Sequence, residues 1–91
     1  MIMKNPPHPG RLVKNELDEF KIPVAAAAKG LGITRQQLYN IINGKSSVTP
    51  EMAVRFSKGI GSTPDTWLRM QMNYDLAQLL PRDIKVSRLV A

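Results

Sequence analysis

The sequence predicts an all-α domain of five helices, and three observations lead to this fold class. Apolar residues recur at helical spacing in one segment after another. Glycines, prolines and threonines stand at the borders of these segments, where helices begin and end. The chain has 91 residues, which is enough for one modest helical core and too few for two independent ones.

The first predicted helix follows Pro9 and Gly10, and apolar residues recur along it at helical spacing: Leu12, Val13, Leu17 and Phe20. Pro23 ends this helix and can occupy the first turn of the second, which covers residues 24–31. Gly32 interrupts the helical pattern. We therefore expect a turn there and a new helix after it.

The third predicted helix begins with Thr34 as its cap and runs to about Asn43, with Gly44 as its left-handed stop. Thr49-Pro50-Glu51 and Thr63-Pro64-Asp65 each supply a capping hydroxyl, a proline for the first helical position and an acid near the positive helix end. These two segments predict a fourth helix that closes at Gly61 and a fifth that reaches Leu80.

The fifth helix carries three large side chains on one face, Trp67, Gln71 and Tyr74. Such a stripe could form a binding site, but we expect these side chains to pack in the core or between protomers. We expect residues 1–80 to form the domain and residues 81–91 a basic tail. The tail pattern is compatible with a short strand, a helical turn or disorder.

Charge and composition favour one class of partner and exclude several classes of site. The net charge is +6, and residues 21–58 hold six basic residues against one acid, a net of +5. This basic middle third indicates a polyanion, with nucleic acid as the leading candidate. The chain has no cysteine, and its single histidine, His8, is expected to be an exposed tail residue rather than a catalytic base.

We therefore expect no enzyme activity, cofactor or metal site. No apolar run is long enough for a membrane span or a signal peptide, so we expect a cytoplasmic protein that does not associate with membranes.

Residues 24–43 predict a helix-turn-helix motif. Ala28, Gly32 and Leu38 have the spacing at which two helices joined by a tight turn pack near a right angle. The third helix then buries one aliphatic stripe and exposes a face of hydrogen-bonding side chains, which match the edges of guanine and adenine. We expect base contacts from Arg35, Gln36, Gln37, Tyr39 and Asn40. We expect phosphate contacts from Thr34, Asn43, Lys45, Ser46 and Ser47.

These motifs resemble the lambda-repressor/Cro-like DNA-binding fold and specifically the HigA (VapI-type) antitoxins. The resemblance covers His8 to about Leu76. It rests on four motifs: His8-Pro9-Gly10, Asn43-Gly44-Lys45, Pro50-Glu51-Met52-Ala53, and Trp67-Leu68 followed by Gln71 and Tyr74-Asp75-Leu76. One departure is Val24, which stands where many repressors of the wider fold have a phosphate-binding glutamine.

The resemblance implies a homodimeric repressor that binds a palindromic operator of double-stranded DNA and regulates its own toxin–antitoxin operon. It also implies a HigB-type toxin, a ribosome-dependent mRNA endonuclease, as a second partner. Two alternatives stay open at this point. The chain could be a protein-binding inhibitor with little DNA binding, or a repressor with no toxin partner.

Overall fold

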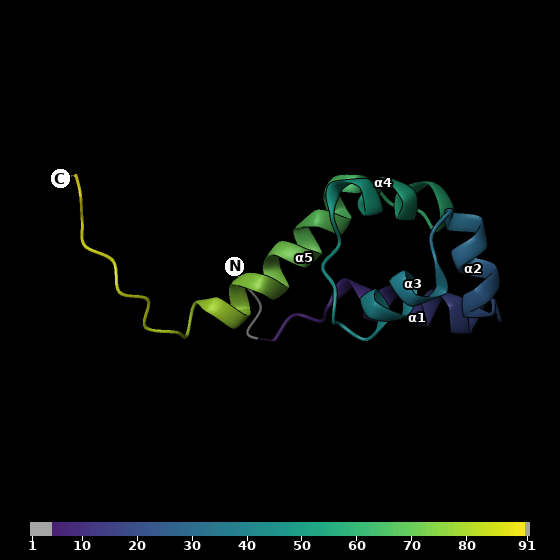
Figure 1. Cartoon of the computed structure of the whole chain (residues 1–91), viewed down its shortest axis with the longest axis horizontal. Coiled ribbons are helices and arrows are strands. Elements are labelled where there is room, and N and C mark those ends of the chain that lie inside the picture. Colours follow the sequence, from purple (N-terminus) through teal and green to yellow (C-terminus); the bar gives the residue numbers. More distant parts are fainter. Residues whose placement is uncertain (1–4, 91) are drawn as a thin grey trace.

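A computed structural model describes residues 5–90, and it contains five helices and no strand in that range. The helices are α1 (Pro9–Glu19), α2 (Val24–Leu31), α3 (Arg35–Ile42), α4 (Pro50–Gly59) and α5 (Pro64–Leu79) (Figure 1). The prediction of an all-α, five-helix fold is thus confirmed. Residues 1–4 and 91 lie outside the described range. No helix in that range is long and apolar enough to cross a membrane.

Threonine caps define the start of three helices. The hydroxyls of Thr34, Thr49 and Thr63 accept the backbone N–H groups of Gln37, Met52 and Thr66, at 3.0, 3.2 and 3.3 Å. These bonds satisfy donors that the first turn of a helix leaves without partners. The three helix starts that these threonines predict are confirmed, whereas α1 begins at Pro9 itself. Pro23 differs slightly, because it is the N-cap of α2 and precedes the first turn.

His8 corrects one expectation. It is not an exposed tail residue, because it is half-buried and caps α1, where its Nδ1 accepts the N–H of Gly10 at 2.9 Å. Its ring meets the ring of Tyr74 edge-on at 4.9 Å. Burial lowers the pKa of His8, although the charge of Asp75 and a hydrogen bond that the ring donates to the backbone of Ser46 act in the opposite direction. His8 therefore links the start of α1 to α5.

The core lies where all five helices meet. Side chains that are under a tenth exposed come from each helix and from the loop before α4: Val13, Leu17, Ala28, Leu31, Leu38, Ile41, Val48, Ala53, Phe56 and Trp67. Trp67 packs against Phe56 with ring centroids 5.1 Å apart, and its Nε1 donates to the Gly61 carbonyl at 2.9 Å. Trp67 and Gln71 are buried in the protomer, as expected for core packing.

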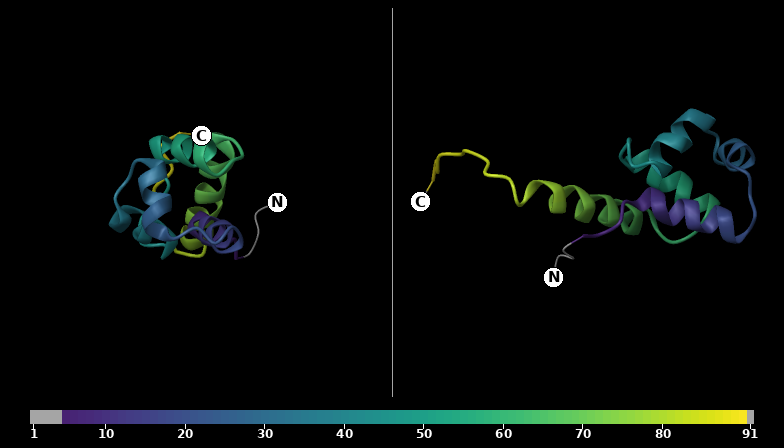
Figure 2. Two further views of the ribbon diagram at one scale, coloured as in Figure 1. Left: turned by 90° about the vertical axis from the view of Figure 1, so that its right-hand side faces the viewer. Right: turned by 90° about the horizontal axis from the view of Figure 1, so that it is seen from below.

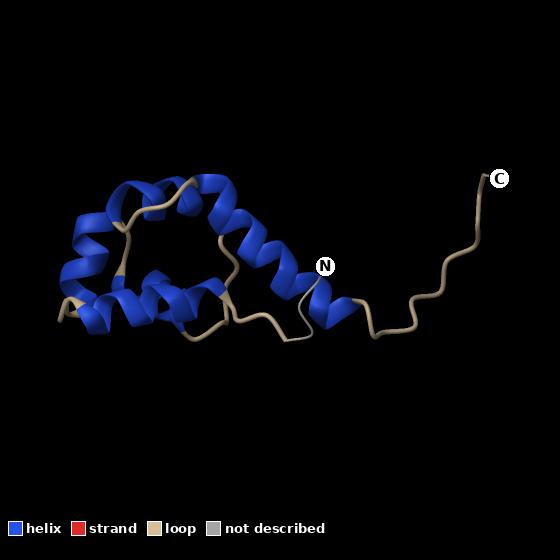
Figure 3. Cartoon of the chain, turned by 180° about the vertical axis from the view of Figure 1, so that it is seen from behind, coloured by secondary structure: helices blue, strands red, loops and turns tan. Residues whose placement is uncertain are grey.

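The last helix projects beyond the rest of the bundle. Figure 2 shows the outer part of α5 and the following segment extending away from the other helices, and Figure 3 shows that this segment is loop. Residues 83–90 have no regular secondary structure and are exposed. The outer end of α5 and this tail leave several apolar side chains exposed: Met72, Leu79, Leu80, Ile84, Val86, Leu89 and Val90.

Candidate nucleic-acid interface

The turn between α2 and α3 is built around Gly32. This residue has φ of 74° and ψ of 30°, a left-handed conformation that glycine adopts without a Cβ penalty. The N–H of Ile33 then donates to the carbonyl of Ala28 at 3.0 Å, which closes the end of α2. Ala28 is only 2% exposed. The geometry matches the close helix crossing that the sequence predicts.

Arg55 of α4 holds this turn from outside the motif. Its Nη1 donates to the carbonyl of Leu31 at 2.8 Å, and its Nη2 bonds Oε1 of Glu51 at 2.8 Å. In the sequence, Arg55 stands out only as one of the six basic residues of positions 21–58. No local pattern could reveal this role, because 24 positions separate donor and acceptor.

The helix α3 has one buried and one exposed side. Leu38 and Ile41 are buried and Ile42 is half-buried, so the aliphatic side anchors the helix. Among the predicted base-contacting residues, Asn40 is half-buried and the other four are exposed: Arg35, Gln36, Gln37 and Tyr39. Asn43 is the C-cap of α3 and is exposed. The structure thus brings the predicted base-contacting side chains to one accessible surface.

Two of the predicted site residues have a structural role at the start of α3. Thr34 and Gln37 form a capping box, in which Gln37 Oε1 accepts the Thr34 N–H at 2.8 Å. The spacing of threonine and glutamine is a local signal that could have revealed this box. Each of these two side chains would therefore have to contact DNA while it also caps the helix.

Replacing Thr34 with alanine should lower the free energy of unfolding by about 1 kcal/mol, because the first turn of α3 loses its side-chain acceptor. Urea unfolding monitored by circular dichroism would measure the loss. Thr34→Ser is the matched control, since it keeps the hydroxyl and should stay close to the wild type. Equal losses in both variants would contradict a capping role for the hydroxyl.

The loop after α3 is folded back onto the end of that helix. Gly44 has φ of 73°, as expected for the stop of α3. The N–H groups of Lys45 and Ser46 donate to the carbonyl of Asn40 at 2.8 and 3.1 Å. Further along, the N–H of Val48 donates to Oε1 of the buried Gln71 at 2.8 Å. The backbone of this loop is therefore fixed by α3 at one end and by α5 at the other.

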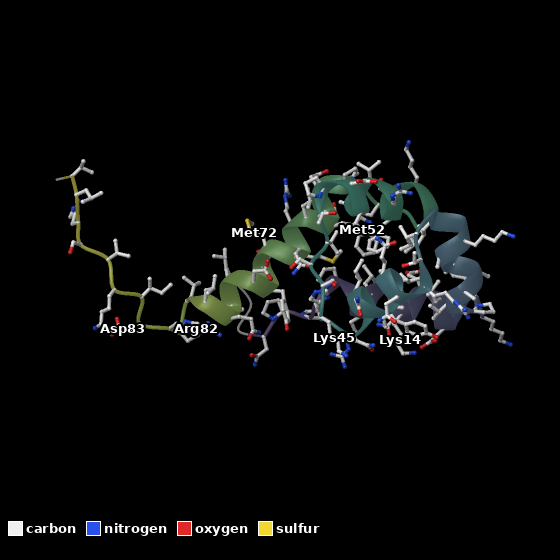
Figure 4. All side chains as sticks on the ribbon, viewed as in Figure 1. Lys14, Lys45, Met52, Met72, Arg82 and Asp83 are labelled. Atoms are coloured by element: carbon white, nitrogen blue, oxygen red, sulfur yellow. The ribbon has the colours of Figure 1, made fainter. Side chains whose placement is uncertain are left out.

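The side chains of this loop remain accessible. Lys45 and Ser47 are exposed and Ser46 is half-buried. Figure 4 places Lys45 on the loop next to α3, at the edge of the molecule opposite α4. The predicted phosphate-contacting residues of the loop therefore lie beside the exposed side of α3.

Most positive charges of the basic middle third have no ionic partner. Within residues 5–90, Arg55 is the only basic residue of positions 21–58 that forms a salt bridge, and its partner is Glu51. The remaining five are exposed: Lys21, Lys29, Arg35, Lys45 and Lys58. Their charges are available to a polyanion. No group of three potential metal-ligating side chains occurs in the described part of the chain.

The fold and this surface define a helix-turn-helix protein. A family model described as "Helix-turn-helix" matches residues 13–68. Virulence-associated protein A' of Dichelobacter nodosus is 49% identical over 78 residues, which are 85% of this chain and 68% of that protein.

Solved structures show the same fold. An addiction module antidote protein of the HigA family from Coxiella burnetii has a TM-score of 0.80 and 36% identity, over 85% of each chain. The antitoxin HigA of Pseudomonas aeruginosa, solved with the higBA promoter, has a TM-score of 0.79 and 28% identity over 85% of each chain. The chain belongs to the helix-turn-helix family of DNA-binding regulators that includes the HigA antitoxins.

Proposed function

We propose that the chain is a homodimeric repressor that binds a palindromic operator in its own operon. In this proposal α3 of each protomer enters a major groove, and the two half-sites lie about 34 Å apart. The observation that carries the proposal is the exposed polar side of α3 beside a fixed loop and unpaired cations. The relative from Pseudomonas aeruginosa, which was solved with promoter DNA, supports the same use of the motif.

Two groups of residues have different roles in this proposal. Base edges are contacted by Arg35, Gln36, Gln37, Tyr39 and Asn40. Phosphates are contacted by Thr34, Asn43, Lys45, Ser46 and Ser47. The base contacts select the sequence, whereas the phosphate contacts fix the register of the protein on the duplex. We infer that the protein acts in the cytoplasm, because the similar proteins come from bacteria, whose DNA lies there.

The test is a binding titration on DNA from upstream of the chain's own gene and on a scrambled duplex of equal length. We expect specific binding at least about a thousandfold tighter than binding to the scrambled duplex. A dimer that neutralises about 6–10 phosphates should give a logarithmic salt slope of roughly −5 to −9. Equal affinity for both duplexes would contradict the proposal.

Replacing Lys45 with alanine should weaken binding to the specific and the scrambled duplex alike. The salt slope should become shallower by about 1 for each protomer, because one phosphate contact is lost. Lys85→Ala is the matched control, since Lys85 is an exposed lysine of the tail that pairs with Asp83 and lies outside the basic middle third. A Lys45 variant that loses only its preference for the specific duplex would contradict a phosphate contact.

We also propose that the chain neutralises a HigB-type endonuclease toxin. Support comes from the exposed apolar side chains of α5 and the tail, which offer an interface to another protein chain. The similar Coxiella burnetii protein is itself described as an addiction module antidote. Co-expression with the neighbouring gene, followed by size-exclusion chromatography, tests both assemblies. A monomeric chain that retains no toxin would contradict both interfaces.

A further inference from the structure

Gln36 and Asn40 lie one turn apart on the exposed side of α3 and are joined by a hydrogen bond. Nε2 of Gln36 donates to Oδ1 of Asn40 at 2.9 Å. Side chains four positions apart are neighbours on a helix, so the regular geometry of α3 is sufficient to bring them together. The two amides therefore form one unit in the free protein.

The two members of this pair are held to different degrees. Asn40 is half-buried, and its backbone carbonyl, at the end of α3, accepts the backbone N–H groups of Lys45 and Ser46. Its side chain lines a surface depression together with residues of the loop and of α4. Gln36 is exposed. The side chain of Asn40 is therefore the more enclosed member of the pair, and Gln36 is the member that protrudes toward a partner.

The hydrogen bond determines what Gln36 can offer. A side-chain amide has a carbonyl oxygen and two N–H donors. One donor of Gln36 is used by Asn40, and no other hydrogen bond among residues 5–90 engages its amide. The acceptor Oε1 and the second N–H donor are left for a partner. The pairing also restrains rotation of the amide.

Only one base presents the complementary edge in the major groove. Adenine offers the N7 acceptor and the N6 donor next to each other, whereas guanine offers two acceptors, cytosine one donor, and thymine an acceptor beside a methyl group. We propose that Gln36 reads an adenine in each half-site and that Asn40 is the positioning residue that orients the Gln36 amide. This inference rests on the proposed function, since it requires α3 in the major groove.

The first step of the test is selection of binding sites from a random duplex pool by the full chain. We expect an adenine in each half-site that the wild type prefers over other bases by roughly 5- to 150-fold. A pool that yields no preferred sequence would contradict the proposed function itself. A preferred site in which no adenine is required would overturn only the role of Gln36.

The second step changes the DNA and leaves the protein intact. That adenine is replaced by 7-deazaadenine, which lacks the N7 acceptor, or by purine, which lacks the N6 amino group. Each replacement should weaken wild-type binding by about 2- to 12-fold, the effect of one lost hydrogen bond. Gln36→Met should be insensitive to both replacements. Equal weakening of this variant and the wild type would overturn the proposal.

The third step separates reading from positioning. Asn40→Ala should reduce the preference for that adenine, and the double variant Gln36→Met/Asn40→Ala should prefer it no less than Gln36→Met alone. Gln78→Met is the matched control, because Gln78 is an exposed glutamine on α5. If the two substitutions reduce the preference for that adenine additively, the positioning role is overturned.

Discussion

Replacing Gly10 with alanine is expected to lower the free energy of unfolding by about 3 kcal/mol, the upper end of the usual cost of overpacking. A Cβ at this position would lie 1.8 Å from the Ile41 carbonyl oxygen and 2.9 Å from the Ile42 Cα. These are backbone atoms at the end of α3, so no side-chain rotation can relieve the contact. Urea unfolding followed by circular dichroism would measure the loss.

Gly30→Ala is the control for this change. Gly30 lies inside α2, is exposed, and has no atom within 4 Å of the position of an added Cβ. Alanine should therefore stabilise the helix by roughly 0.5–1 kcal/mol. If both glycine variants shift the unfolding midpoint in the same direction, the close approach of α1 to α3 is not the reason that position 10 requires glycine.

Replacing Trp67 with alanine is expected to cost about 3–5 kcal/mol, because it removes the largest fully buried side chain and leaves a cavity beside Phe56. It also removes the donor to the Gly61 carbonyl. Thermal and urea unfolding would both measure the effect.

Two further variants check the cause of this loss. Trp67→Phe keeps an aromatic ring in the core but lacks the donor, so it should cost less than the alanine variant. Tyr39→Ala removes an aromatic ring that is 46% exposed, and it should change stability by no more than about 0.5 kcal/mol. A comparable loss in the Tyr39 variant would contradict the conclusion that the burial of Trp67 causes its large effect on stability.

The helix borders could be predicted because their signals are local. A threonine cap, a proline in the first turn and a left-handed glycine act within a few residues, so Thr49 and Gly44 indicate their roles by position alone. The exposed side of α3 could be predicted for a similar reason. Helical periodicity separates Leu38 and Ile41 from the polar residues once the helix is placed.

The contacts that fix the candidate interface could not be predicted in this way. Gln71 reaches Val48 across 23 positions and Arg55 reaches Leu31 across 24. The ring contact of His8 depends on Tyr74, which lies near the other end of the domain. Such pairs appear only when the helices are assembled, because no sequence spacing records which turns become neighbours.

The bonds of Arg55 to the Leu31 carbonyl and to Glu51 have a consequence for the thermodynamics of DNA binding. They restrain the turn between α2 and α3 in the free protein, so this segment loses little conformational freedom when DNA is bound. The entropic penalty of ordering the motif is thus incurred during folding. We expect association to be limited by the desolvation of polar side chains and by the release of counterions, with little contribution from rearrangement of the backbone.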